Sequence, residues 1–118
     1  MGSTKIDSYS EEHIVLSSLF KALGHPARLA IIEYLIKRDS CVCGDIVNKL
    51  PLAQPTVSQH LKELKTVGLI KGSVEGNAIC YCINENVLDI LNKRLSSFTE
   101  KLKLKVLHEN EKNIKNCC

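Results

Sequence analysis

The sequence has few aromatic residues and no long hydrophobic run. Aromatic side chains make up 4% of the 118 residues, and tryptophan is absent. The core must therefore be built from Leu, Ile and Val, and aromatic platforms for stacking single-stranded nucleic acid are not expected. No apolar stretch approaches the ~20 residues of a membrane span, and the polar segment 1–12 does not resemble a secretory signal. We therefore expect a cytoplasmic protein without a membrane partner.

Motifs of the common enzyme classes are also missing. The sequence contains no phosphate-binding loop, no dinucleotide-binding fingerprint and no nucleophile elbow. His25 stands directly before Pro26 at an expected helix start, where a capping role explains it better than base catalysis. We predict that the protein is not an enzyme and requires no cofactor.

The six cysteines occur in pairs, but none of the pairs has CxxC spacing. They form two CxC pairs, Cys41/Cys43 and Cys80/Cys82, and a final Cys117-Cys118 pair. In a reducing cytosol such residues are more often free thiols or metal ligands than disulfides.

The apolar spacing predicts one domain that is mainly α-helical and carries a small β-hairpin. The expected helices cover residues 11–23, 26–37, 40–50, 54–66 and 84–107, with strands at 69–74 and 78–83 around a turn at 75–77. Gly24 and Pro26 separate the first two helices, and Ser40 is the expected N-cap of the third. We expect a flexible segment 1–10, a domain 11–107 and a polar tail 108–118 ending in Cys-Cys. Short helix, turn, second helix and hairpin in this order are typical of a winged helix-turn-helix.

Each element has an expected buried face. In the first two helices the residues expected inside are Leu16, Leu19, Phe20, Leu23, Leu29, Ile32, Leu35 and Ile36. In the second strand the alternation groups Ile79, Tyr81 and Ile83 on one face and puts Cys80 and Cys82 on the outer face.

Helix 54–66 combines an apolar face with a face of short polar side chains. If Val57, Leu61 and Leu64 are buried, the residues facing outward are Thr56, Ser58, Gln59 and Lys62. Short uncharged groups near the start of a recognition helix can approach base edges in the major groove. The residues expected near phosphates are His60, Lys62, Lys65 and, on the hairpin, Lys71 and Asn77. The alternative class is a winged-helix interaction protein without DNA binding.

The last helix carries a narrow apolar seam. Leu88, Leu91, Leu95, Phe98 and Leu102 are spaced 3, 4, 3 and 4 residues apart, as in helices that pack lengthwise on one another. Two half-sites one turn of DNA apart require two recognition helices about 34 Å apart. We therefore expect a homodimer on double-stranded DNA of two-fold symmetry, with use of the seam inside one protomer as the alternative.

Two segments resemble the signatures of the ArsR/SmtB family of metalloregulatory repressors. They are Leu19–Leu29 (LFKALGHPARL) and Gln54–Leu64 (QPTVSQHLKEL), followed by Gly68-Leu69-Ile70, and the similarity spans about residues 16–83. The resemblance implies a homodimer built on the first and last helices, binding to an operator, and release by an inducer. Within the recognition helix it points to Gln54, Thr56, Ser58, Gln59 and His60.

Segment 40–46, SCVCGDI, resembles the CVCDL element that gives many family members a thiolate site. Cys41 and Cys43 do not share a face of a regular helix, so they can bind one ion only at an irregular helix start. Soft ions prefer thiolates, and As(III) typically takes three sulfurs. The third cysteine of arsenic-sensing members is replaced here by Ile46. We expect an As(III) inducer bound by Cys41, Cys43 and one or both of Cys117 and Cys118, from the same or the partner chain.

Other inducers are consistent with the same residues. Zn(II) or Cd(II) would need four ligands, for example Cys41, Cys43 and His13 with one more. The family's other zinc site, on the last helix, looks absent because Leu91 stands two residues after Asp89, where a histidine is expected. Thiol oxidation or persulfide sensing through a disulfide is a third reading.

The cysteines also have interpretations without any ligand. Cys41 and Cys43 can be small buried residues, and the tail pair can be simply solvated. Cys80 and Cys82 match no inducer ligand of the family pattern, and their role is left open.

Overall fold

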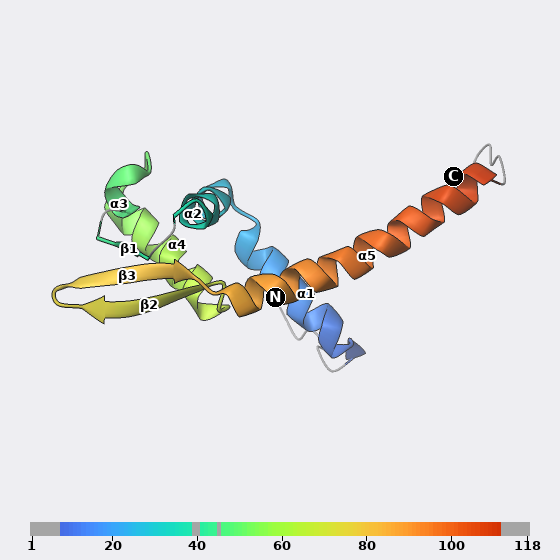
Figure 1. Ribbon diagram of the computed structural model, residues 1–118, viewed down its shortest axis with the longest axis horizontal. Helices are drawn as coiled ribbons and strands as arrows, with labels where there is room; N and C mark the ends of the chain where they lie inside the picture. Colours follow the sequence, from blue (N-terminus) through green and yellow to red (C-terminus); the bar gives the residue numbers. More distant parts are fainter. Residues whose placement is uncertain (1–7, 39–40, 45, 112–118) are drawn as a thin grey trace.

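The computed structural model describes residues 8–38, 41–44 and 46–111, with the backbone alone for Cys43, Val47 and Glu111. The elements in chain order are α1 (Glu11–Leu23), α2 (Pro26–Ile36), β1 (Val42–Cys43), α3 (Ile46–Lys49), α4 (Gln54–Thr66), β2 (Ile70–Glu75), β3 (Ala78–Ile83) and α5 (Glu85–Glu111). The β2–β3 hairpin extends from one end of the molecule and α5 from the other (Figure 1). The mainly helical fold and the winged helix-turn-helix order are confirmed.

The junction between α1 and α2 forms as predicted. Gly24 is the C-cap of α1, and its N–H donates to the Lys21 carbonyl. The Nδ1 atom of His25 accepts a hydrogen bond from the Ala27 backbone N–H at 3.0 Å, which satisfies a donor that the helix start leaves unpaired. The predicted capping role of His25 is confirmed.

The core consists of aliphatic side chains, as expected from the lack of aromatics. Its buried members include Leu19, Ile31, Ile32, Leu35, Ile46, Val57, Leu61, Leu64, Leu69 and Ile70. The predictions for Phe20, Leu29 and Ile36 are wrong, since these side chains are 42%, 52% and 57% exposed. The sequence of α2, PARLAIIEYLI, has apolar residues all around the helix, so spacing alone could not select the face that packs inward.

The segment predicted as the third helix begins as a strand. Val42–Cys43 forms β1, which pairs antiparallel with β3, and α3 starts only at Ile46. The sheet order is β1-β3-β2, so β3 is the central strand. Gly44 between strand and helix has φ +74°, a left-handed conformation through which a right-handed helix cannot continue. Ser40, the predicted N-cap, lies outside the described residues.

The predicted hairpin is confirmed, but the prediction of which β3 side chains face outward is wrong. Glu75 pairs with Ala78 across a two-residue turn, in which Gly76 has φ +63°. Tyr81 packs against the core, yet Ile79 on the same face is 47% exposed. Cys80 is only 2% exposed, so its predicted position on an outer face is wrong. The added strand β1, which lies beside β3 at this position, was absent from the prediction.

Helix α5 starts beside α1 and then leaves the domain (Figure 1). Arg94 forms an ion pair with Glu12 of α1 at 3.4 Å, and the helix runs to Glu111, past the predicted end at residue 107. Leu88 and Leu91 pack against the core, whereas the later seam residues Leu95, Phe98 and Leu102 are 36%, 49% and 53% exposed. Within the described part of the chain, no helix is sufficiently long and apolar to span a membrane.

Candidate nucleic-acid interface and cysteine cluster

The two faces of α4 are those that the sequence predicts. Val57, Leu61 and Leu64 are at most 2% exposed and join the core. The exposed residues of the helix include Gln54, Thr56, Ser58, Gln59, Lys62 and Lys65. The N-cap residue Ala53 makes no side-chain capping bond, so N–H groups of the first turn are left for an outside acceptor such as a phosphate oxygen. This helix therefore offers short polar groups and two cations on a surface that the core does not use.

Neighbouring residues orient two of these side chains. The Gln59 amide donates to a Glu63 carboxylate oxygen at 3.0 Å, one turn further along α4. The ammonium of Lys65 lies toward β2, 3.4 Å from where a Cβ atom at Gly72 would stand. The absence of a side chain at Gly72 thus leaves room for Lys65 between α4 and the hairpin.

His60 is not on the outward face of α4, so little of its side chain is open to the predicted phosphate contact. The side chain is 7% exposed, its Nδ1 accepts from the Nε–H of Arg28 at 3.0 Å, and its ring lies 4.4 Å from that of His25. Burial lowers the pKa of His60, and the nearby positive charges of His25 and Arg28 lower it further. Arg28 also donates to the Ala22 carbonyl at 3.2 Å. This polar cluster attaches α4 to the α1–α2 junction.

The hairpin residues predicted to approach DNA are exposed. Lys71 lies on β2, and Asn77 lies in the turn at the tip. In the antiparallel register Lys71 is directly opposite Cys82 of β3. A cation of the wing is therefore adjacent to the cysteine that the sequence left without a role.

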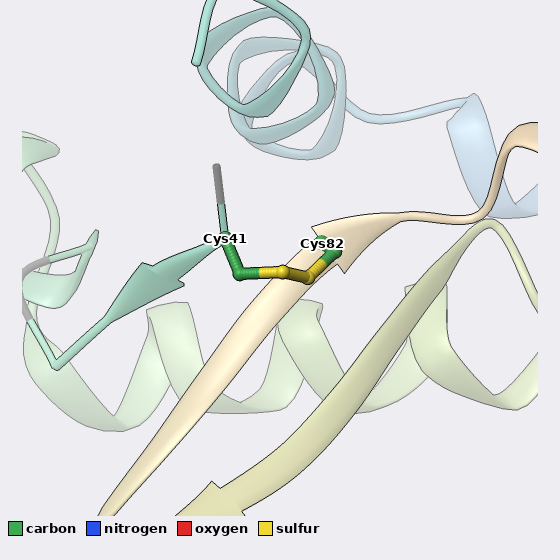
Figure 2. The surroundings of a disulfide bond; sticks show 2 residues. All are labelled: Cys41 and Cys82. Atoms are coloured by element: carbon green, nitrogen blue, oxygen red, sulfur yellow. A yellow bond between two sulfur atoms is a disulfide. The ribbon is translucent and has the colours of Figure 1, made fainter. Parts of the chain in front are cut away.

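The cysteines come together in a combination that the sequence analysis did not foresee. Cys41, which precedes β1, forms a disulfide with Cys82 of β3, and their Cα atoms are 4.5 Å apart (Figure 2). The register also places Cys43 opposite Cys80. The two CxC pairs thus lie on neighbouring strands. Their identical spacing was the available signal, but it is informative only if residues 41–43 are extended.

The other predicted ligands do not add to this cluster in the described part of the chain. Cys117 and Cys118 lie outside the described residues. His13 is exposed in the first turn of α1, where its backbone N–H donates to the Ser10 hydroxyl. Among the side chains that the structure describes, no three His, Cys, Asp or Glu residues are gathered as a metal site.

The comparisons with known proteins agree with this architecture. Residues 25–71 match the model of a family described as "Bacterial regulatory protein, arsR family". The arsenical resistance operon repressor of Staphylococcus xylosus is 35% identical over 88 residues, which is 75% of this chain and 80% of that protein. The chain belongs to the ArsR family. An HTH-type transcriptional regulator of Methanocaldococcus jannaschii is 37% identical over 83 residues, covering 69% of this ArsR-family chain and 92% of that protein.

Solved structures share the fold of this ArsR-family protein. An ArsR-like transcriptional regulator from Rhodococcus sp. RHA1 superposes with a TM-score of 0.71 at 19% identity, over 86% of this chain and 95% of that one. The family, the named relatives and the exposed α4 face make the protein a DNA-binding transcriptional repressor of the winged helix-turn-helix type.

Proposed function

We propose that this ArsR-family repressor acts in the cytoplasm, binds an operator of two-fold symmetry as a homodimer, and is released from it by As(III). The observation that carries the DNA-binding part is the exposed polar face of α4. Thr56 and Ser58 are exposed over a fully buried apolar face, beside Lys62 and Lys65. Short polar groups read base edges, while the cations bind phosphates.

The homodimer is supported by the exposed part of the α5 seam. Leu95, Phe98 and Leu102 lie on one stripe of a helix that projects from the domain, and each is at least 36% exposed. A second copy of the same stripe would remove this apolar surface from water. Such a pairing through α5, with α1 beside it, would hold two recognition helices in a fixed relation.

As(III) is the inducer that the cysteines and the relatives favour together. Cys41 and Cys43 stand directly before α3, the first helix of the DNA-binding pair, and thiolates suit soft ions. Relatives that are 35% and 33% identical are named arsenical resistance operon repressors, in Staphylococcus xylosus and Staphylococcus aureus. Zn(II) and Cd(II) are the alternative inducers, but His13, their expected further ligand, is exposed at the start of α1.

The test is operator binding by fluorescence anisotropy, using DNA from upstream of the protein's own gene. We expect reduced protein to bind this DNA in preference to a scrambled duplex and to dissociate when arsenite is added. Cys41→Ser should bind DNA normally but resist arsenite. Failure to bind would favour the winged-helix interaction protein, and unchanged release in Cys41→Ser would exclude the thiolate site.

A second candidate inducer is thiol oxidation, which the Cys41–Cys82 disulfide favours. The bond joins the segment before α3 to the wing, so its formation can change how the two DNA-contacting parts are held. If this candidate is right, oxidised and reduced protein will differ in operator affinity without any arsenite. Cys82→Ser will abolish that difference.

A further inference from the structure

We infer that Cys82 of the wing is an inducer ligand, which completes a three-thiolate As(III) site with Cys41 and Cys43. The inference rests on the proposed As(III) response and names the ligand that the sequence motif lacks. It assigns a function to a cysteine for which the family pattern provides none.

The site needs a ligand from outside segment 41–46. The position that supplies a third cysteine in arsenic-sensing relatives is Ile46 here, and this side chain is 1% exposed within the core cluster. It offers no sulfur, and it fills a place in the core. Because As(III) typically takes three sulfurs, two cysteines of this segment leave the ion one ligand short.

Cys82 is within reach of Cys41. Its sulfur is in covalent contact with that of Cys41 (Figure 2). Two sulfurs close enough to form a disulfide need only a small outward movement to bind one ion when they are reduced. Cys43 lies two residues from Cys41 on β1, which pairs with the strand that carries Cys82.

The tail cysteines of the same chain cannot take this place. Helix α5 begins at Glu85, three residues after Cys82, and its 27 residues extend about 40 Å at ~1.5 Å per residue. The seven residues 112–118 span at most about 25 Å even when fully extended. Cys117 and Cys118 therefore cannot return from the end of α5 to Cys41. Cys117 and Cys118 could take this place only from a partner chain.

The surroundings suit an ion that binds thiolates. A cavity of about 540 Å³ is lined by Cys41 and Cys82 together with Arg38 and Lys71. Cations beside a thiol favour its thiolate form, which is the form that binds metals. In the binding step arsenous acid, As(OH)₃, reacts with three thiols. Three S–As bonds replace three As–O bonds, each hydroxide leaves with a thiol proton as water, and arsenic keeps its oxidation state.

The position of Cys82 connects the inducer to DNA contacts. Cys82 is opposite Lys71 in the hairpin, and Cys41 leads through β1 and Gly44 into α3. An ion held by both cysteines ties the wing to the first helix of the DNA-binding pair. We therefore expect the bound ion to change the position of the wing relative to α3 and α4, which must contact the operator together.

The experiment compares the reduced full-length protein with Cys82→Ser and with the double variant Cys117→Ser/Cys118→Ser as the matched control. Arsenite is titrated in the presence of a phosphine reductant, and X-ray absorption counts the sulfur atoms bound to arsenic. Operator affinity is measured for each protein with and without arsenite. We expect three sulfurs in the wild type and the tail variant, and two in Cys82→Ser. We also expect Cys82→Ser to bind arsenite more than about 100-fold more weakly, because even the loss of outer-shell partners costs 10–100-fold.

Operator binding without arsenite shows that each variant is folded and separates the outcomes. If arsenite releases Cys82→Ser as it releases the wild type, the role of Cys82 is refuted while the repressor function stands. If the tail variant loses a sulfur instead, the third ligand belongs to the tail of the partner chain. That result would also refute the role of Cys82. If arsenite fails to release the wild type from DNA, As(III) is not the inducer, and the proposed role of Cys82 as an inducer ligand is refuted as well.

Discussion

At the residue scale, His60 couples folding to pH. Its Nδ1 can accept from Arg28 only while the imidazole is neutral, and burial holds its pKa below the ordinary value of about 6.5. Well above pH 6.5, His60 is neutral in both the folded and the unfolded protein, and its full contribution to the free energy of unfolding is present. Below pH 6.5 the unfolded chain binds a proton that the folded protein resists, so stability is lost as the pH falls through the lowered pKa.

We therefore predict that the free energy of unfolding falls between pH 7.5 and pH 5.5, by up to about 1.4 kcal/mol per pH unit from this residue. His60→Gln retains a polar side chain but cannot take up a proton, so its stability should fall less over the same range. Urea unfolding of both proteins at the two pH values measures the difference. Equal losses in the two proteins would contradict this role of His60.

Ser58 provides the corresponding test on the exposed face of α4. Ser58→Ala removes one hydroxyl from an exposed helical position, so thermal stability should stay within about 0.5 kcal/mol of the wild type. If the hydroxyl contacts a base, operator affinity should fall by about 1–3 kcal/mol, with an unchanged salt dependence. Ser96→Ala on α5 is the matched control and should bind DNA normally. Equal affinities of the two variants would exclude Ser58 from base recognition.

The difference between these two residues shows what helical spacing can predict. The exposed face of α4 was predicted correctly because Val57, Leu61 and Leu64 define the buried stripe without ambiguity. The same stripe includes position 60, three residues after Val57 and four before Leu64. His60 was placed outside because its polar character outweighed its position. Its partly buried partner Arg28 is 32 residues away in sequence, and such a pairing has no local signal.

At the scale of elements, the wing provides the next prediction. Lys71 is exposed on β2, and as a phosphate ligand it should contribute to the affinity for any DNA sequence. We predict that Lys71→Ala weakens operator and scrambled DNA about equally and reduces the slope of log K against log salt by roughly 1. Lys103→Ala on α5 removes the same charge away from the wing. A slope that changes equally in both variants would indicate only the loss of overall charge.

A comparison of α1, the hairpin and β1 shows which elements the local sequence pattern can predict and which it cannot. The first helix and the hairpin were predicted because caps, apolar spacing and the Gly-Asn turn are all encoded within a few residues. Strand β1 was missed because its two residues gain their conformation from pairing with β3, about 40 positions away. The error affected the site directly, since a helix at 41–43 separates the two cysteines and a strand brings them beside Cys80 and Cys82.

At the scale of the whole molecule, the exposed half of the α5 seam is the surface through which we propose that two protomers pair. Burial of a Phe side chain contributes about 1.5–3 kcal/mol, and a two-fold interface buries Phe98 twice. Because each ring is 49% exposed in the protomer, we predict that Phe98→Asp weakens dimerisation by roughly 1.5–3 kcal/mol, or about 10- to 150-fold in the dimer dissociation constant. Sedimentation equilibrium of the wild type and the variant measures this change directly.

The same substitution tests whether DNA binding requires the dimer. Since Phe98 belongs to α5, the helix that projects away from α4 (Figure 1), Phe98→Asp should bind a single half-site as the wild-type protomer does. It should lose the steep gain in affinity that a two-fold operator provides, because the two recognition helices are no longer held together. Ser97→Asp adds the same charge beside the seam and should remain dimeric, which separates loss of packing from charge repulsion. A Phe98→Asp protein that stays dimeric and binds the full operator normally would mean that another surface joins the protomers.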